Sequence, residues 1–181
     1  MNAAASKSRA SPWIRAIGAS VIAVALVFVA LAARGLDVAG HFTHAHFHLR
    51  APDFALLGRQ RVVLKLHIGA ALTALAVGIV IMLRPKGVGL HRTLGWSWVI
   101  AMATTAVSSL FLHGLNGDKL SLIHLLSGWV IVALPMGVWA IRSRKVQMHR
   151  RMMTGLFVGG LLGAGALTFI PGRLVWAVFF G

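Results

Sequence analysis

Five long apolar stretches, separated by shorter polar segments, constrain this chain more than any other feature. They cover about residues 14–33, 62–83, 93–112, 122–141 and 153–171. A helix that rises about 1.5 Å per residue needs roughly 20 residues to cross the hydrocarbon of a bilayer, and each stretch has about that length. Only 12% of the 181 residues are charged, which is too few to cover the surface of a soluble domain of this size. The sequence therefore predicts an all-α integral membrane protein with five transmembrane helices.

The segments between the stretches predict how the helices pack. Arg84-Pro85-Lys86-Gly87 and Leu115-Asn116-Gly117-Asp118 have the composition of tight turns, and short turns place consecutive helices antiparallel. We expect residues 62–181 to form a four-helix bundle of two tandem helix-pair repeats, at about 62–112 and 122–175. The remaining divisions are a disordered cytoplasmic tail at 1–13, an N-terminal anchor helix at 14–33 and an outer loop at 34–61.

The first apolar stretch allows a second interpretation. Lys7 and Arg9 precede it, and it ends at Ala30-Leu31-Ala32, which resembles the cleavage site of a signal peptide. We favour an uncleaved anchor, and a cleaved signal peptide is the alternative. The topology of the later helices is the same in both cases.

The basic residues predict the orientation of the helices. With the N-terminus in the cytoplasm, eleven Lys and Arg side chains lie inside and seven outside, together with all three acids. This is the positive-inside bias, and Trp96 and Trp98 lie at the expected inner interface, where tryptophans anchor helices. We expect a multi-pass protein of the bacterial inner membrane with a periplasmic C-terminus. Because topology accounts for much of the net charge of +15, the sequence does not indicate a nucleic-acid partner.

The chain contains no cysteine. Disulfides, thiolate metal sites, iron–sulfur clusters and covalent attachment of haem through cysteine are therefore excluded. Any haem would be bound non-covalently, and any metal ion would be held by histidine, methionine or oxygen ligands.

Four histidines stand near the starts of four apolar stretches, in two matching pairs. His124 follows His67 at nearly the same interval at which His149 follows His91, and each of the latter two precedes an arginine. In a bundle of two repeats, equivalent positions face each other across the bundle axis. Haem b needs two axial imidazoles in such a gap between helices. The pattern predicts His67 with His124 as one axial pair, and His91 with His149 as a second.

The same histidines have a simpler interpretation as anchors. A histidine at a helix end lies at the level of the lipid headgroups, where a polar ring is tolerated. An ionisable residue indicates function only when it lies inside the membrane. The sequence leaves both interpretations open.

A second group of histidines lies in the outer loop. His41, His44, His46 and His48 fall within eight residues, and in an extended chain the last three share one face. Neutral imidazoles suit zinc or copper, so these four residues are a candidate metal site. The alternative is a polar loop with only weak metal affinity.

Two short motifs resemble a known family. Leu90-His91-Arg92-Thr93-Leu94-Gly95-Trp96 and His149-Arg150-Arg151-Met152-Met153 resemble a bacterial family of uncharacterised membrane proteins, domain of unknown function 2306, over about residues 62–175. The resemblance implies a membrane location and a helical architecture, and no activity. The arrangement of histidine pairs near both faces of the bundle is also similar to that of the ascorbate-reducible dihaem cytochromes b.

Three functional hypotheses follow. The leading one is a small b-type cytochrome-like protein that moves electrons between a quinol and a periplasmic redox protein, with haem b on the paired histidines. The second is a non-enzymatic membrane subunit or assembly factor whose histidines are interfacial. The third is a metal-handling protein that binds zinc or copper through the outer loop.

Overall fold

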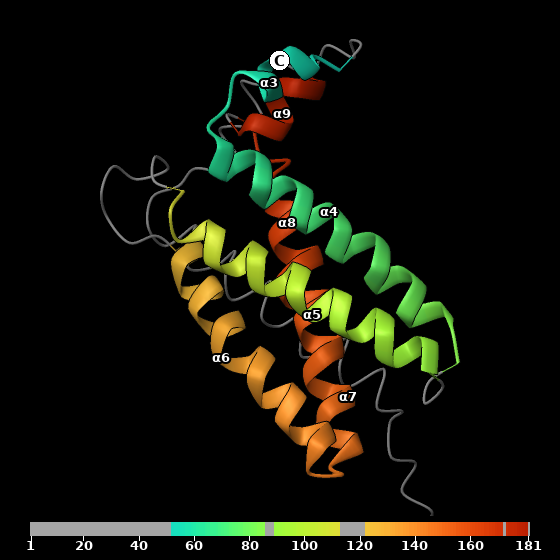
Figure 1. The fold of residues 1–181 in the computed structure, drawn as a ribbon. Coiled ribbons are helices and arrows are strands. Elements are labelled where there is room, and N and C mark those ends of the chain that lie inside the picture. The colour runs from blue at the N-terminus through green and yellow to red at the C-terminus, as the bar shows by residue number, and fades with distance from the viewer. Residues whose placement is uncertain (1–51, 86–88, 113–121, 172, 181) are drawn as a thin grey trace, which may run out of the picture.

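A computed structural model describes residues 52–85, 89–112, 122–171 and 173–180. The predicted tail, the anchor helix and the histidine-containing part of the outer loop lie outside these residues, whereas residues 52–61 of that loop are described and include a short helix. The described part is helical and contains no strand (Figure 1). Its elements in chain order are α3 (Phe54–Gly58), α4 (Val62–Leu83), α5 (Gly89–Ser109), α6 (Leu122–Arg142), α7 (Val146–Gly155), the π-helix η1 (Leu156–Gly163), α8 (Ala164–Leu167) and α9 (Leu174–Phe179).

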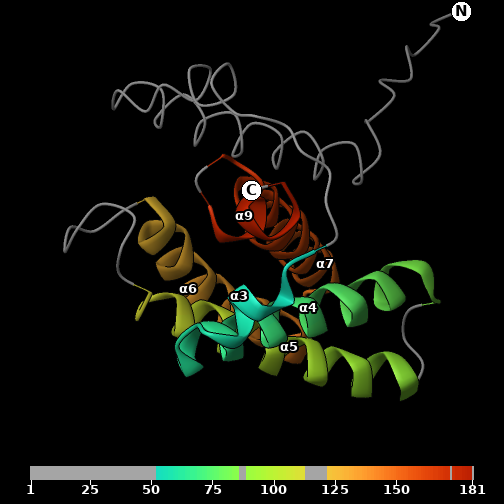
Figure 2. The same cartoon turned by 90° about the horizontal axis from the view of Figure 1, so that it is seen from above.

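Helix α4 has the bounds that the apolar pattern predicts. It ends where Arg84 turns to an extended conformation, with ψ at 157°. The cause is Pro85, whose ring disfavours a helical conformation in the residue before it. Helix α5 then returns beside α4 (Figures 1 and 2). It begins earlier than the predicted residue 93, so that His91 and Arg92 belong to its first turn.

A Schellman motif ends helix α6. The backbone N–H of Lys145 donates to the Ala140 carbonyl at 2.8 Å, and that of Arg144 donates to the Ile141 carbonyl at 3.1 Å. This motif requires a left-handed residue just beyond the helix, usually glycine. Here the residue is Arg144, with φ at 58°. The motif reverses the chain tightly, so that α7 packs back against α6.

The fifth predicted stretch forms a composite helix. Elements α7, η1 and α8 follow one another without interruption from Val146 to Leu167. The helix begins well before the predicted residue 153, so His149 and Arg150 are helical. Its middle third has π-helical hydrogen bonding, a rare geometry that often marks functional sites. The helix therefore starts well before the predicted span 153–171, and its π-helical middle has no counterpart in the apolar pattern.

Helices α4, α5 and α6 and the composite helix of α7, η1 and α8 form a closed ring. Helix α4 packs on α5, α5 on α6, α6 on α7 and η1, and η1 again on α4. The core lies where these elements meet and is built from small and large apolar side chains in contact. Its buried members are Ala74, Trp98, Ala101, Met102, Ala106, Val130, Ala133, Leu134, Leu156, Phe157 and Leu161.

Two helices in the described part of the chain are long and apolar enough to cross a membrane, Val62–Leu83 and His124–Arg142. Of the five predicted spans, the second and fourth thus have a matching helix. The third corresponds to α5, which carries several hydroxyl side chains, and the fifth to the composite helix. Neither meets the same criterion, so their membrane assignment stays a prediction.

Candidate ligand cavity at the basic end of the bundle

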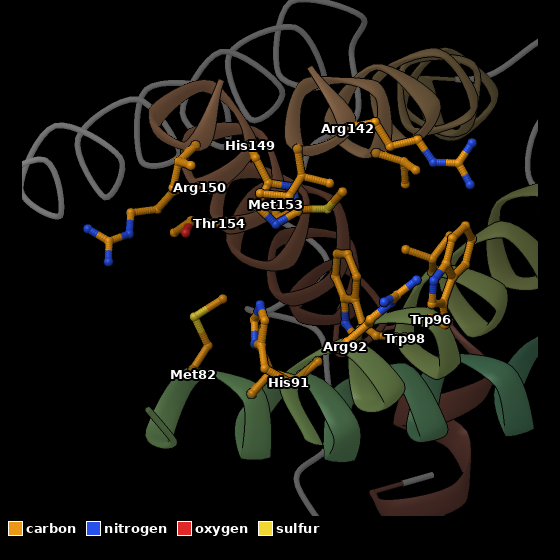
Figure 3. A pocket seen from close by; sticks show the side chains of 17 residues that line it. Met82, His91, Arg92, Trp96, Trp98, Arg142, His149, Arg150, Met153 and Thr154 are labelled. Atoms are coloured by element: carbon orange, nitrogen blue, oxygen red, sulfur yellow. The ribbon is translucent and has the colours of Figure 1, made fainter. Parts of the chain in front are cut away.

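A cavity of about 690 Å³ opens at one end of the ring (Figure 3). The carboxyl ends of α4 and α6 meet the amino ends of α5 and α7 there. Most of its wall is apolar, with Ile81, Met82 and Val99 among the lining residues. Its size is within the range of about 300–1,000 Å³ that small-molecule and cofactor sites occupy. We call this end of the molecule the basic end, because the turn between α6 and α7 and the first turns of α5 and α7 carry its cationic side chains.

The structure brings His91 and His149 to this one cavity. His91 projects from α5 and His149 from α7, on opposite walls (Figure 3). The Nδ1 atom of His149 lies 2.9 Å from the Gly137 carbonyl oxygen. A carbonyl oxygen only accepts, so Nδ1 carries the proton and donates. With the proton on Nδ1, Nε2 is the ring nitrogen that can offer a lone pair, as in a histidine that ligates a metal ion.

Arginine side chains supply the charge of the cavity. Arg92, Arg142 and Arg150 all contribute to its lining, and all three are exposed. The guanidinium of Arg142 lies over the Trp96 ring, 5.8 Å from its centroid. The described residues include one acid, Asp53, which caps α3 at the other end of the molecule. The cavity mouth is therefore positive and favours anionic groups.

The floor of the cavity depends on a glycine that the sequence analysis did not identify. A Cβ atom on Gly78 would lie 2.6 Å from Cδ2 of Phe157 and 2.9 Å from Nε1 of Trp98. The absence of a side chain lets both rings pack directly against α4. Trp98 is only 5% exposed, so it is a core residue and not the interfacial anchor that its position near the helix start predicted.

His67 lies elsewhere, near the start of α4. Its Nδ1 atom is 3.0 Å from the Thr105 carbonyl oxygen and 3.1 Å from Oγ of Ser108. Since Nδ1 donates to the carbonyl, Nε2 again keeps the lone pair. A 2.5 Å hydrogen bond between Ser109 and Ser127 ties α5 to α6.

The partly buried His124 precedes Ser127 by one turn. Neither His67 nor His124 lines the cavity at the basic end. Their pairing across the bundle stays a prediction.

The predicted metal site falls outside the described residues, since His41, His44, His46 and His48 all precede residue 52. Within the described ranges no group of three or more His, Asp or Glu side chains is arranged to hold a metal ion. The zinc or copper site therefore stays a prediction.

The model of a family described as "Predicted membrane protein (DUF2306)" matches residues 64–180 of the chain. Neither the curated proteins nor the solved structures compared with the chain gave a match. The matched range includes all the residues that line the cavity and the four helical segments of the ring, apart from the first two residues of α4. The resemblance carried by the His91-Arg92 and His149-Arg150 motifs is thereby confirmed, and the chain belongs to this family of membrane proteins.

Proposed function

We propose that the cavity at the basic end binds one haem b, with His91 and His149 as the two axial ligands. The observation that carries the proposal is the position of these imidazoles on opposite walls of a single apolar cavity. A porphyrin is flat and largely apolar, and a gap between helices of a bundle is a common place for it. The repeated sequence pattern favoured His67 with His124, whereas the cavity favours the other pair.

The contact of His149 with the α6 backbone supports its role as a ligand. Histidines that ligate a metal ion usually donate their second ring N–H to a carboxylate or a backbone carbonyl. The Gly137 carbonyl supplies that acceptor. The hydrogen bond fixes the tautomer and restrains the ring, which would leave Nε2 as the nitrogen that holds iron.

The arginines match the acidic part of the same ligand. Haem b carries two propionate groups, and arginine binds carboxylates through paired N–H donors. Arg92 and Arg150 lie on the helices that carry the two histidines, one residue after each. In this proposal Arg92 and Arg150 would hold the two propionates.

The chemistry that this site would support is electron transfer. Haem iron changes by one electron between the ferric and ferrous states, and axial histidine ligation helps to set its potential. In our proposal a quinol in the bilayer gives up its two electrons one at a time and releases two protons. A periplasmic one-electron acceptor takes the electrons.

Transfer across the membrane would need the second pair, His67 with His124. Met82 lines the cavity, and at a rise of about 1.5 Å per residue His67 lies about 22 Å from it along the axis of α4. On the orientation predicted by the basic residues, the cavity faces the cytoplasm and the second pair faces the periplasm.

The test is haem content in the full chain. The protein is purified from cells supplied with a haem precursor, and bound haem is measured per chain for the wild type and for two double variants. We expect His91→Ala/His149→Ala to lose more than nine-tenths of the haem of the cavity, because removal of both axial ligands leaves no bond to iron. His67→Ala/His124→Ala is the matched control and keeps that haem.

Two results would contradict the proposal. Wild-type protein without haem would favour a membrane subunit or assembly factor. Loss of all haem from the control alone would move the site to the other pair.

A further inference from the structure

The turn between α6 and α7 carries three cationic side chains within four residues. Arg142, Arg144 and Lys145 are all exposed at the basic end. Arg142 lies over Trp96, as described above, and Nζ of Lys145 lies 4.4 Å from the centroid of the Trp139 ring. Trp96 is 44% and Trp139 is 51% exposed, so both side chains are accessible at the surface of the protein. Two of the three cations are therefore held in place by tryptophans.

Arg144 occupies a position where glycine would cost less. Its φ of 58° lies in the left-handed region, where a side chain clashes with the backbone and a glycine does not. The Schellman motif needs the conformation but not the guanidinium. A strained residue is a reason to look for a function of its side chain. The exposed guanidinium of Arg144 makes that function an interaction with something outside the chain.

Among the described residues, no acidic side chain lies beside these charges. The whole chain has three acids, Asp37, Asp53 and Asp118, and none lies in the sequence near the α6–α7 turn. Asp53, the one in the described ranges, lies at the far end beside α9 (Figure 1). Within the described part of the chain, the turn thus presents a compact positive surface that is open to anionic ligands.

We propose that the α6–α7 turn binds the phosphate headgroups of acidic phospholipids. The tryptophans favour a lipid over a soluble anion, since exposed tryptophans concentrate at the headgroup level of membranes. The turn also directly follows α6, which is one of the two described helices that are apolar and long enough to span a bilayer. Basic surfaces at the ends of membrane helices bind acidic lipids with about a fivefold gain in affinity per Lys or Arg.

The experiment measures lipid binding to the full chain in a neutral detergent by native mass spectrometry. Short-chain phosphatidylglycerol and phosphatidylcholine serve as probes, and each is titrated separately. We expect wild-type protein to prefer phosphatidylglycerol. Arg144→Gly should reduce that preference about fivefold, and Arg144→Gly/Lys145→Gln about 25-fold. Arg59→Gln/Arg61→Gln, with an equal change of charge before α4, should leave it within twofold.

The choice of Arg144→Gly keeps the result interpretable. This substitution relieves backbone strain, so a loss of lipid preference cannot come from a damaged fold, and the melting temperature in detergent checks this directly. Equal affinity of the wild type for both lipids, or an equal loss in the Arg59/Arg61 control, would overturn the proposal. So would competition by inorganic phosphate at the concentration of the lipid, which would indicate a site for a free anion. The histidines are untouched, so the outcome is independent of haem binding.

Discussion

Replacement of Gly78 by alanine tests the packing that forms the cavity floor. The new Cβ atom would lie 2.6 Å from Cδ2 of Phe157 and 2.9 Å from Nε1 of Trp98, well inside contact distance. Both rings are buried, at 7% and 5% exposure, so neither has free space into which to move. Overpacking of this kind costs about 1–3 kcal/mol.

The same substitution also has a favourable component. Alanine is a better helix former than glycine by about 1 kcal/mol. Gly69 provides the matched control, because it lies on the same helix and a Cβ atom there meets nothing within 4 Å. We expect Gly69→Ala to be neutral or to stabilise by up to about 1 kcal/mol. The difference between the two variants then isolates the steric cost, at about 1–3 kcal/mol in favour of Gly69→Ala.

The assay is reversible chemical unfolding of both variants and the wild type in the same detergent, followed by tryptophan fluorescence. A midpoint shift without a change of slope reports a change of stability. Equal stability of Gly69→Ala and Gly78→Ala would refute the close approach of Trp98 and Phe157 to α4. The arrangement of the cavity floor would then be wrong.

Three further predictions use the same unfolding assay. Arg144→Gly should stabilise the protein by about 1 kcal/mol because it relieves the left-handed strain, and a loss of stability would contradict the assigned turn. Ser127→Ala should destabilise by about 0.6 kcal/mol by removing the hydrogen bond to Ser109, whereas Ser97→Ala, on an exposed surface, should change stability by less. Gly137→Ala should destabilise the protein by less than about 1 kcal/mol, because the new Cβ atom would meet the flexible end of the Met153 side chain. A loss of stability as large as that of Gly78→Ala would show that Met153 is not free to move.

The extent of the helices could be predicted wherever apolar length decided it. The predicted stretch 62–83 coincides with α4, and 122–141 differs from α6 by one residue at its end. The predictions were less accurate where polar residues belong to a helix. His91, Arg92, His149 and Arg150 interrupt the apolar pattern, yet they form the first turns of α5 and α7, because helix ends continue past the apolar core.

The cavity could be predicted only in part. The repeat placed His91 and His149 at equivalent helix starts, and the structure brings both to one cavity. The sequence could not show which histidine pair has open space between its helices. That space depends on contacts between distant residues, such as the packing of Trp98 against Gly78 and the packing of Phe157 against Gly78. Neither feature has a signal in the pattern of a single helix.

Electron paramagnetic resonance of the ferric full-chain protein tests the central claim most directly, because it reports the axial ligands of haem iron. If His91 and His149 face each other across one iron, the wild type gives the low-spin signal of bis-imidazole ligation. His149→Ala converts that signal to high spin or abolishes it. A wild-type protein without a haem signal, or a low-spin signal of undiminished intensity in both His91→Ala and His149→Ala, would contradict the account.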